Sequence, residues 1–247
     1  MDFYETRFGR ILVGERDDLF AHKASLLRQL AQDASDLEAS VGLTGGSTPK
    51  AFYQWAVDGQ HLTEPRLRPL VWSVSDERHT PLDSDESNFG NARRLLLEPL
   101  GIPPGNHLPW PVHYDPEAAA EIYLDAWRER FGPERAYDLC FAGMGDDNHT
   151  LSLFPGSRLI RDNPPLLFAA VEVPGKGWRL TLTPSGLHRC AHIVLTVTGE
   201  AKARPLRKVF TEPLDVAERP VQLLAEHAER TTWLIDPPAA TGLHNLL

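Results

Sequence analysis

The sequence predicts a doubly wound, Rossmann-like α/β fold with a mainly parallel sheet and helices on both faces. Short apolar segments alternate with amphipathic ones along the chain, and the apolar segments are nearly continuous rather than interrupted by polar residues. Strand–helix alternation is typical of βαβ units. Continuous apolar strands suit a parallel sheet that is covered on both faces.

Buried strands are expected at five places, namely residues 41–43, 70–74, 137–142, 192–197 and 232–235. Two further segments, 167–173 and 178–183, flank a Pro-Gly-Lys-Gly turn, which predicts a short antiparallel hairpin or edge pair in the second half of the chain. No repeat or linker interrupts this pattern, so we expect one α/β domain over residues 1–247.

Helical signals fall between these strands. Asp115, Pro116 and Glu117 form a favourable helix start, with an N-cap residue, a proline at the first helical position and an acid in the first turn. Another candidate helix covers residues 88–97. Apolar side chains at helical spacing mark an earlier helix, at Phe20, Ala24, Leu27 and Ala31.

The composition excludes several classes of protein. The 25 basic and 34 acidic residues give a net charge of -9, which argues against a nucleic-acid or anionic-membrane partner. The two cysteines lie in apolar stretches, and no CxxC or HExxH spacing predicts a metal site. No signal peptide and no apolar run of the ~20 residues that a membrane span needs is found. A cytoplasmic protein is expected.

The first polar strand end is the segment 44–50, in which Gly45 and Gly46 precede Ser47 and Thr48. Paired glycines allow a tight turn and a close approach to a ligand. Ser47 or Thr48 can cap the helix that follows, and the free N–H groups of such a helix start bind anions such as phosphate. The alternative is a plain strand–helix turn with a capping hydroxyl.

Two more strand ends carry cationic side chains. Arg78 follows Ser75, Asp76 and Glu77 after the strand at 70–74, and is either part of a solvated turn or a bidentate phosphate ligand. Lys202 follows the strand at 192–197, in the first turn of a predicted helix, and either faces solvent or meets a ligand phosphate there.

The segment 143–150 is the most informative. His149 follows a buried strand, two glycines and two carboxylates, which predicts a polar loop at the ligand-binding edge of the sheet. Imidazole accepts a proton near neutral pH. Asp147, two residues earlier, can fix its tautomer as a carboxylate does in catalytic triads. A structural histidine is the alternative.

In their order along the chain these pieces resemble the 6-phosphogluconolactonase family, within the larger group that includes glucosamine-6-phosphate deaminases. The residues that carry the resemblance are 42–49, 76–78, 81–83, 87–90, Gly143, Met144, Gly145, Asp147, His149, Thr150, 152–156, 179–183, Gly199, Lys202, Ala203 and 233–236.

The resemblance implies hydrolysis of 6-phospho-D-glucono-1,5-lactone to 6-phosphogluconate, in the oxidative pentose phosphate pathway, without a metal or organic cofactor. It places the catalytic histidine at His149. It assigns phosphate contacts to the turn from Gly45 to Thr48, to Arg78, to Lys202 and, more weakly, to Arg179. Backbone N–H groups near Gly45 and Gly46, or within 143–145, would stabilise the oxyanion. A monomer or weak homodimer is expected.

Two residues depart from the family pattern. Asn148 stands where the family usually has glycine, and asparagine is among the best substitutes if that position needs a positive φ. Pro205 requires that the helix after Lys202 either starts late or kinks. Two alternative functions stay open at this point. One is the related deaminase–isomerase, which tends to read Asp-Glu-Tyr where this chain has Asp76-Glu77-Arg78, and the other is a non-catalytic sugar-phosphate-binding regulator.

Overall fold

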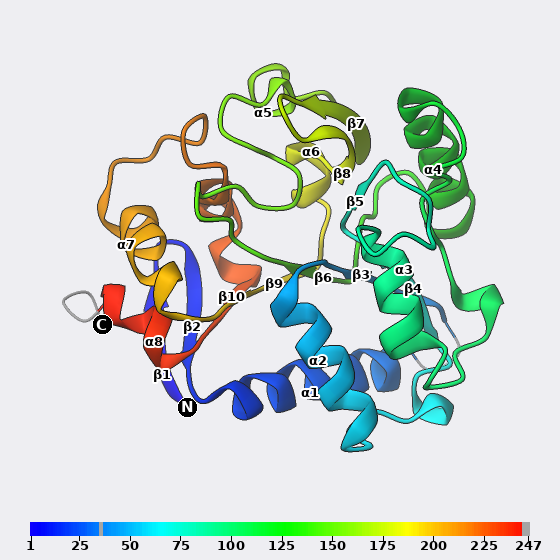
Figure 1. The fold of residues 1–247 in the computed structure, drawn as a ribbon, viewed down its shortest axis with the longest axis horizontal. Coiled ribbons are helices and arrows are strands. Elements are labelled where there is room, and N and C mark those ends of the chain that lie inside the picture. The colour runs from blue at the N-terminus through cyan, green and yellow to red at the C-terminus, as the bar shows by residue number, and fades with distance from the viewer. Residues whose placement is uncertain (35–36, 244–247) are drawn as a thin grey trace.

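The larger of two sheets contains mostly parallel strands. The computed structural model describes residues 1–34 and 37–243, and this sheet has the strand order β1-β2-β10-β9-β6-β3-β4 (Figure 1). Its strands are β1 (Asp2–Thr6), β2 (Gly9–Val13), β3 (Ala39–Leu43), β4 (Leu70–Val74), β6 (Leu139–Ala142), β9 (His192–Val197) and β10 (Thr231–Ile235). Only β1 and β2 pair antiparallel. The predicted doubly wound fold is confirmed.

The second sheet is small and antiparallel. It has the order β5-β8-β7 and consists of β5 (Asp76–Arg78), β8 (Gly177–Leu182) and β7 (Phe168–Val173). The predicted hairpin is therefore present as β7 and β8. The third strand, β5, was expected only as a polar strand end, but it follows β4 after the single residue Ser75. The chain thus passes directly from one sheet to the other.

Helices lie on both sides of the larger sheet, which crosses the middle of Figure 1 with α1 and α2 below it and the second sheet above it. The helices are α1 (Arg16–Ala34), α2 (Ser47–Asp58), α3 (Asn88–Ala92), α4 (Pro116–Phe131), α5 (Arg158–Asp162), α6 (Pro184–Leu187), α7 (Ala203–Thr211) and α8 (Pro237–Ala240). Short 3-10 turns are η1 (Glu64–Arg66), η3 (Pro104–Asn106), η4 (Glu200–Lys202), η5 (Pro220–Arg230) and η6 (Thr241–Leu243), and the π-turn η2 (Arg93–Leu97) continues α3. Within the described ranges no helix combines the length and apolarity needed to cross a bilayer.

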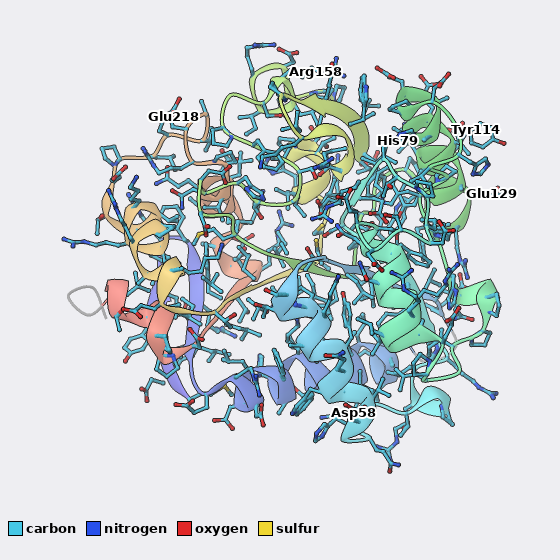
Figure 2. The ribbon with its side chains drawn as sticks, viewed as in Figure 1. Asp58, His79, Tyr114, Glu129, Arg158 and Glu218 are labelled. Atoms are coloured by element: carbon cyan, nitrogen blue, oxygen red, sulfur yellow. The ribbon has the colours of Figure 1, made fainter. Side chains whose placement is uncertain are left out.

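The core explains why these elements form. The side chains expected to face inward from α1 are buried, and so are the strands of the larger sheet from β3 to β4. A group of aromatic rings joins α4 to the second sheet: Trp110 stacks on Tyr123 with 3.9 Å between ring centroids, and Phe168 of β7 meets Tyr123 and Trp127 edge-on at 5.0 Å. Exposed charges such as Asp58, Glu129 and Glu218 lie around the rim (Figure 2).

The strand order fixes where a ligand can bind. From β3 the chain moves outward to β4 and then returns to β6 on the other side of β3, so the direction of winding reverses between β3 and β6. Loops that follow the strands at such a switch point separate and leave a crevice. Here these loops are 44–46 and the segment after Ala142. Ser75 ties them together, because its Oγ lies 3.0 Å from Leu43 O and 2.9 Å from Phe141 O.

A buried carboxylate organises the crossing into the second sheet. Glu77 accepts hydrogen bonds from the backbone N–H groups of Arg78, Asn88 and Phe89 and from the hydroxyl of Ser87. Burial raises the pKa of Glu77 to about 7, although the four donors act in the opposite direction. Ser87 also caps α3 by accepting from Gly90 N.

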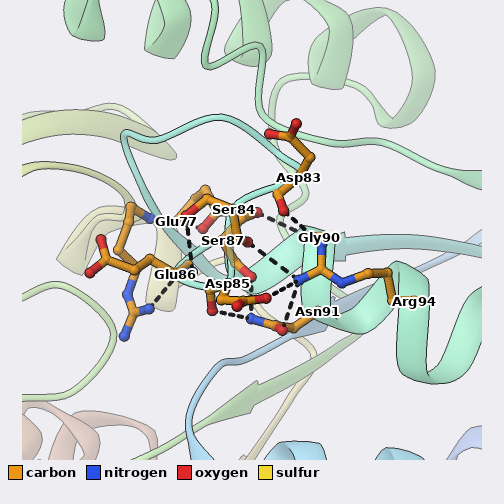
Figure 3. A network of polar contacts seen from close by, with 10 residues as sticks. Glu77, Asp83, Ser84, Asp85, Glu86, Ser87, Gly90, Asn91 and Arg94 are labelled. Atoms are coloured by element: carbon orange, nitrogen blue, oxygen red, sulfur yellow. Dashed lines mark hydrogen bonds and ion pairs between the residues drawn. The ribbon is translucent and has the colours of Figure 1, made fainter.

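The segment 83–91 completes the network around α3 (Figure 3). Arg94 donates to the backbone oxygens of Asp83 and Ser84 and to Oδ1 of Asn91. Asn91 donates in turn to the backbone oxygens of Asp85 and Ser87. This segment is therefore ordered by donors and acceptors, together with Phe89, which is buried in the core.

Glu77→Gln should destabilise the protein. The NH2 group of the glutamine side chain donates hydrogen bonds and cannot accept them. At least one of the four donors to Glu77 therefore loses its acceptor. We expect a loss of about 2–3 kcal/mol in the free energy of unfolding, which corresponds to about 4–12 °C in Tm for a chain of this size. Calorimetry measures it. The matched control is Glu86→Gln, whose side chain is exposed; equal Tm values for the two variants would contradict this account.

Candidate active site

The turn after β3 is shaped by its glycines. Gly46 has φ +110° and is the N-cap of α2, and Ser47 is the first helical residue. The prediction that Ser47 or Thr48 caps the helix is wrong, because no side-chain cap hydrogen bond is formed and Thr48 Oγ1 instead lies 2.7 Å from Thr198 Oγ1. The first turn of α2 therefore keeps N–H groups that precede its first backbone bond, from Lys50 N to Gly46 O.

Gly45 is required by a close neighbour. A Cβ at this position would lie 1.8 Å from Oδ1 of Asn88. Asn88 cannot easily move away, because its Nδ2 donates to Asp76 O at 2.8 Å. Tyr53 fixes the other side of the turn by donating to Thr44 O at 2.7 Å. The turn is thus held against both β5 and α2.

The loop after β6 presents a histidine–carboxylate pair. Nδ1 of His149 lies 2.5 Å from Oδ1 of Asp147, and His149 N donates to the same oxygen at 3.2 Å. Partial burial pushes the pKa of Asp147 up, but the hydrogen bond and charge of His149 outweigh it and hold that pKa below its usual value. An ionised Asp147 keeps a proton on Nδ1 and leaves Nε2 as the acceptor. The imidazole stacks on Phe154 at 4.1 Å and is 28% exposed.

The close fit around His149 depends on its neighbours in the loop. A Cβ at Gly145 would lie 2.0 Å from the imidazole Nδ1. Asn148 has φ +62°, as expected if this position needs a positive φ. Its Nδ2 donates to Pro205 O at 3.0 Å, and its own carbonyl accepts from Val221 N at 3.0 Å. The two departures from the family pattern, Asn148 and Pro205, are therefore bonded to each other.

Lys202 points at this same loop. Its ammonium donates to Met144 O at 2.8 Å and to Asp146 at 2.6 Å. The helix after it starts late: Lys202 ends η4, α7 begins at Ala203, and Pro205 is the third residue of α7, where no intrahelical N–H bond is lost. The late-start alternative is confirmed, and the aim of Lys202 is defined.

Arg78 and Arg179 lie opposite each other on β5 and β8 of the second sheet. Asp76 is buried near them and accepts a hydrogen bond from Ser152 at 2.7 Å. Burial raises the pKa of Asp76, while Ser152 and the charges of Arg78, His149 and Arg179 counteract this. The guanidinium of Arg78 donates to Glu86 O at 2.6 Å. These two cations therefore lie on the second sheet near Asp76.

A cavity of about 140 Å³ joins the turn to the loop. It is lined by residues 44–49, 142–144, 196–198, Lys202 and Lys23. Arg78, Arg179 and His149 are not among its lining residues. A larger cavity of about 580 Å³ lies between α4 and β7, but it contains none of the predicted site residues. We place the site at the smaller one because it lies at the switch point, where the polar loops converge.

Sequence reasoning missed Lys23, which belongs to α1 and lines the cavity from below. Its spacing from Phe20 and Leu27 put it on the buried face of that helix, and this was the available signal. One group of potential metal ligands also exists within residues 1–34 and 37–243: His188, Glu226 and His227 have ligand atoms within 4.8 Å of one another. It belongs to neither loop of the candidate site.

The sequence matches the family described as glucosamine-6-phosphate isomerases/6-phosphogluconolactonase over residues 14–233. The chain therefore belongs to this family of α/β sugar-phosphate proteins.

Individual relatives fall on the lactonase side of the family. The 6-phosphogluconolactonase of Synechocystis is 32% identical over 222 residues, which cover 83% of this chain and 85% of the relative. That of Mycobacterium leprae is 32% identical, with coverage of 83% and 85%. The solved 6-phosphogluconolactonase from Thermotoga maritima has a TM-score of 0.74 at 26% identity and covers 92% of this chain and 98% of its own.

Substitutions at Asn148 should separate backbone strain from hydrogen bonding. Asn148→Gly keeps the positive φ and loses the bond to Pro205 O and a weak one to Met144 Sδ, so a loss of about 1 kcal/mol is expected. Asn148→Val adds a β-branched side chain in the left-handed region and should cost about 2–3 kcal/mol in all. Denaturant unfolding measures both. If the valine variant is as stable as the glycine variant, the strained loop conformation is not required.

Proposed function

We propose that this protein hydrolyses 6-phospho-D-glucono-1,5-lactone to 6-phosphogluconate, with His149 as the general base. The observation that carries the proposal is the His149–Asp147 pair, which stands on the same loop that Lys202 contacts at the edge of the cavity. One loop thus connects a proton acceptor to a cationic cavity lined by a helix N-terminus. Hydrolysis of a phosphorylated lactone needs a proton acceptor for the attacking water and a cationic site for the phosphate.

The phosphate end of the substrate is assigned to the turn and Lys202. The N–H groups of Ser47 and Thr48 open α2, and a helix start attracts an anion through these groups and its dipole. Lys202 would exchange its contact with Asp146 for the phosphate. Arg78 and Arg179 are proposed to reach the substrate from the second sheet.

The reaction follows from where the proton acceptor lies. With Nδ1 held by Asp147, Nε2 of His149 takes a proton from water as the water oxygen bonds to the lactone carbonyl carbon. The tetrahedral intermediate then breaks the bond between that carbon and the ring oxygen. The proton on His149 passes to the departing oxygen, which becomes the C5 hydroxyl, and the carboxylic acid left at C1 loses its proton to solvent and becomes a carboxylate. The atoms balance without a cofactor.

The oxyanion is assigned to backbone N–H groups. The segment 143–145 is less available for this role than the turn after β3, because Gly145 N already donates to His149 O at 2.9 Å. The turn at Gly45 and Gly46 is therefore the favoured donor.

His149→Ala should reduce the turnover number by about 10²–10⁴-fold, which is the usual contribution of a general base. Asp147→Asn should reduce it as well, because it leaves the imidazole in the wrong tautomer. The measurement is acid release from the lactone at slightly acid pH, where spontaneous opening is slower, with ammonia release from glucosamine 6-phosphate as the comparison. Wild-type turnover in a folded His149→Ala variant would refute the assignment. Release of ammonia by the wild type, without lactone hydrolysis, would instead make the protein a deaminase.

Lys202→Ala and Arg78→Ala should mainly raise KM, because they remove binding that is shared by the ground state and the transition state. About tenfold or more is expected for the loss of one charge-assisted bond. Lys208→Ala is the matched control, since Lys208 is an exposed lysine of α7 outside the cavity. If KM is unchanged in both test variants, the phosphate assignment fails.

A further inference from the structure

Lys23 is a buried cation without a counter-charge. It lies on the inner face of α1, between Phe20 and Ala24, and is 2% exposed. Its ammonium lies 4.4 Å from the ring centroid of Phe52 and 4.7 Å from that of Phe141. Within the described ranges neither a carboxylate nor another hydrogen-bond acceptor contacts it. Lysine is almost never fully buried unless it is paired, so these two rings are an incomplete environment for a charge.

The ammonium borders the cavity of the candidate active site. Lys23 lines the same 140 Å³ space as the turn from Gly45 to Thr48 and Lys202. Thr196 of β9 lines it too, and its buried Oγ1 is without a hydrogen-bond partner in the part of the chain that the structure describes. Lys23 of α1 and Thr196 of β9 thus both line one small space, and neither side chain has a hydrogen-bond partner among the described residues. Buried polar groups in native proteins are nearly always satisfied.

We propose that Lys23 and Thr196 form the floor of the phosphate-binding cavity, and that Lys23 is a ligand of a phosphate dianion held there. The ligand class is a phosphate monoester or inorganic phosphate. This inference rests on the proposed function for the identity of the natural ligand, but not for the binding of phosphate itself.

The charges and the size of the cavity suit a dianion. Lys23 and Lys202 supply two positive charges, and the N-terminus of α2 adds about half a charge. A space of 140 Å³ holds a phosphate group and a few waters, since one water occupies about 30 Å³. A neutral sugar hydroxyl would leave the Lys23 ammonium uncompensated, whereas Lys202 is already paired with Asp146.

Binding at Lys23 should be coupled to a proton. Burial lowers the pKa of Lys23 to about 7, so the free protein holds this group largely neutral at pH 8. A phosphate dianion beside it favours the charged form and raises the pKa again. Phosphate should therefore take up a proton from solvent as it binds at pH 8. Below pH 7 the lysine is already charged and its uptake disappears, while phosphate that is present as the monoanion releases a proton when it binds as the dianion.

Other groups near Lys23 do not titrate in this range. β3 and β4, which pack against α1, carry no titratable side chain. Burial raises the pKa of Tyr53 on α2, and the Cys190 thiol together with burial raises that of Cys140 on β6. Burial lowers the pKa values of His22 on α1 and His192 on β9, so both are neutral at pH 8. Lys202, the second ammonium of the cavity, is ion-paired with Asp146.

The test is calorimetric titration of inorganic phosphate into wild type, Lys23→Met and Lys208→Met at pH 8, in Tris and in HEPES. Because the two buffers differ in ionisation enthalpy, they report the protons taken up. We expect wild type and Lys208→Met to take up close to one proton per phosphate. Lys23→Met should take up almost none and bind about tenfold or more weakly at pH 6.5, where the wild-type lysine is charged. Equal affinity and equal uptake in Lys23→Met and wild type would overturn the proposal.

Folding of the variant is not a confounder, because methionine is an unbranched side chain only one heavy atom shorter than lysine and removes an unpaired buried charge. Its Tm should equal or exceed that of wild type below pH 7. A second measurement needs no variant: the NMR shift of the Lys23 Cε in wild type should titrate near pH 7 and move to higher pH with phosphate. A titration that phosphate leaves unchanged would also overturn the proposal.

The outcome is separable from that of the proposed function. If Lys202→Ala loses phosphate while Lys23→Met binds it normally, the cavity stands and Lys23 has only a packing role. If the wild type binds no phosphate at concentrations up to about 10 mM, roughly tenfold above the Kd of a weak millimolar site, the Lys23 proposal falls. Lactone hydrolysis by that same protein then decides the catalytic proposal independently.

Discussion

The parallel pairing of β3 with β6 is the constraint on which the candidate site depends. These strands are far apart in sequence, yet their register sets Val41 opposite Leu139 and Gly42 opposite Cys140. Their ends therefore meet, and the turn at 44–48 lies beside the loop at 143–150. Ser75 bonds to both strand ends and starts the crossing into the second sheet. The turn at 44–48, His149 and Lys202 each follow a strand of the larger sheet, whereas Arg78 and Arg179 come from the second sheet.

The loop that carries His149 is held in an unfavourable backbone conformation by contacts outside it. Asn148 and Leu151 both have positive φ, which for a residue such as leucine costs about 1–3 kcal/mol. Bonds from Asn148 to Pro205 and from Thr150 to Gly143 O compensate for this. Because α7 also follows Lys202, the Asn148–Pro205 bond links the loop of the proposed general base to the helix that follows the proposed phosphate ligand. A rigid link of this kind keeps catalytic groups in register without a moving lid.

Local sequence pattern was enough for the parallel strands and the main helices, because their apolar spacing records which faces are buried. It was not enough for β5, since Asp76 and Glu77 look like a solvated turn and are buried only because distant donors satisfy them. The hairpin of β1 and β2 was missed because its alternating, partly exposed residues differ from the continuous apolar strands of the sheet centre. Capping by Ser47 or Thr48 failed because Gly46 takes the N-cap position itself. Lys23 was overlooked because the residues around it and its cavity come from four elements that are distant in sequence. These elements are α2, β6, β9 and η4.

The most direct test of the account is a crystal structure with bound 6-phosphogluconate. The phosphate should lie within hydrogen-bond distance of Ser47 N or Thr48 N and of Lys202 Nζ, and the product carboxylate should face Nε2 of His149. A phosphate bound away from both Lys202 and the start of α2, or a carboxylate that does not reach His149, would contradict the central claim that one loop joins a phosphate cavity to a general base.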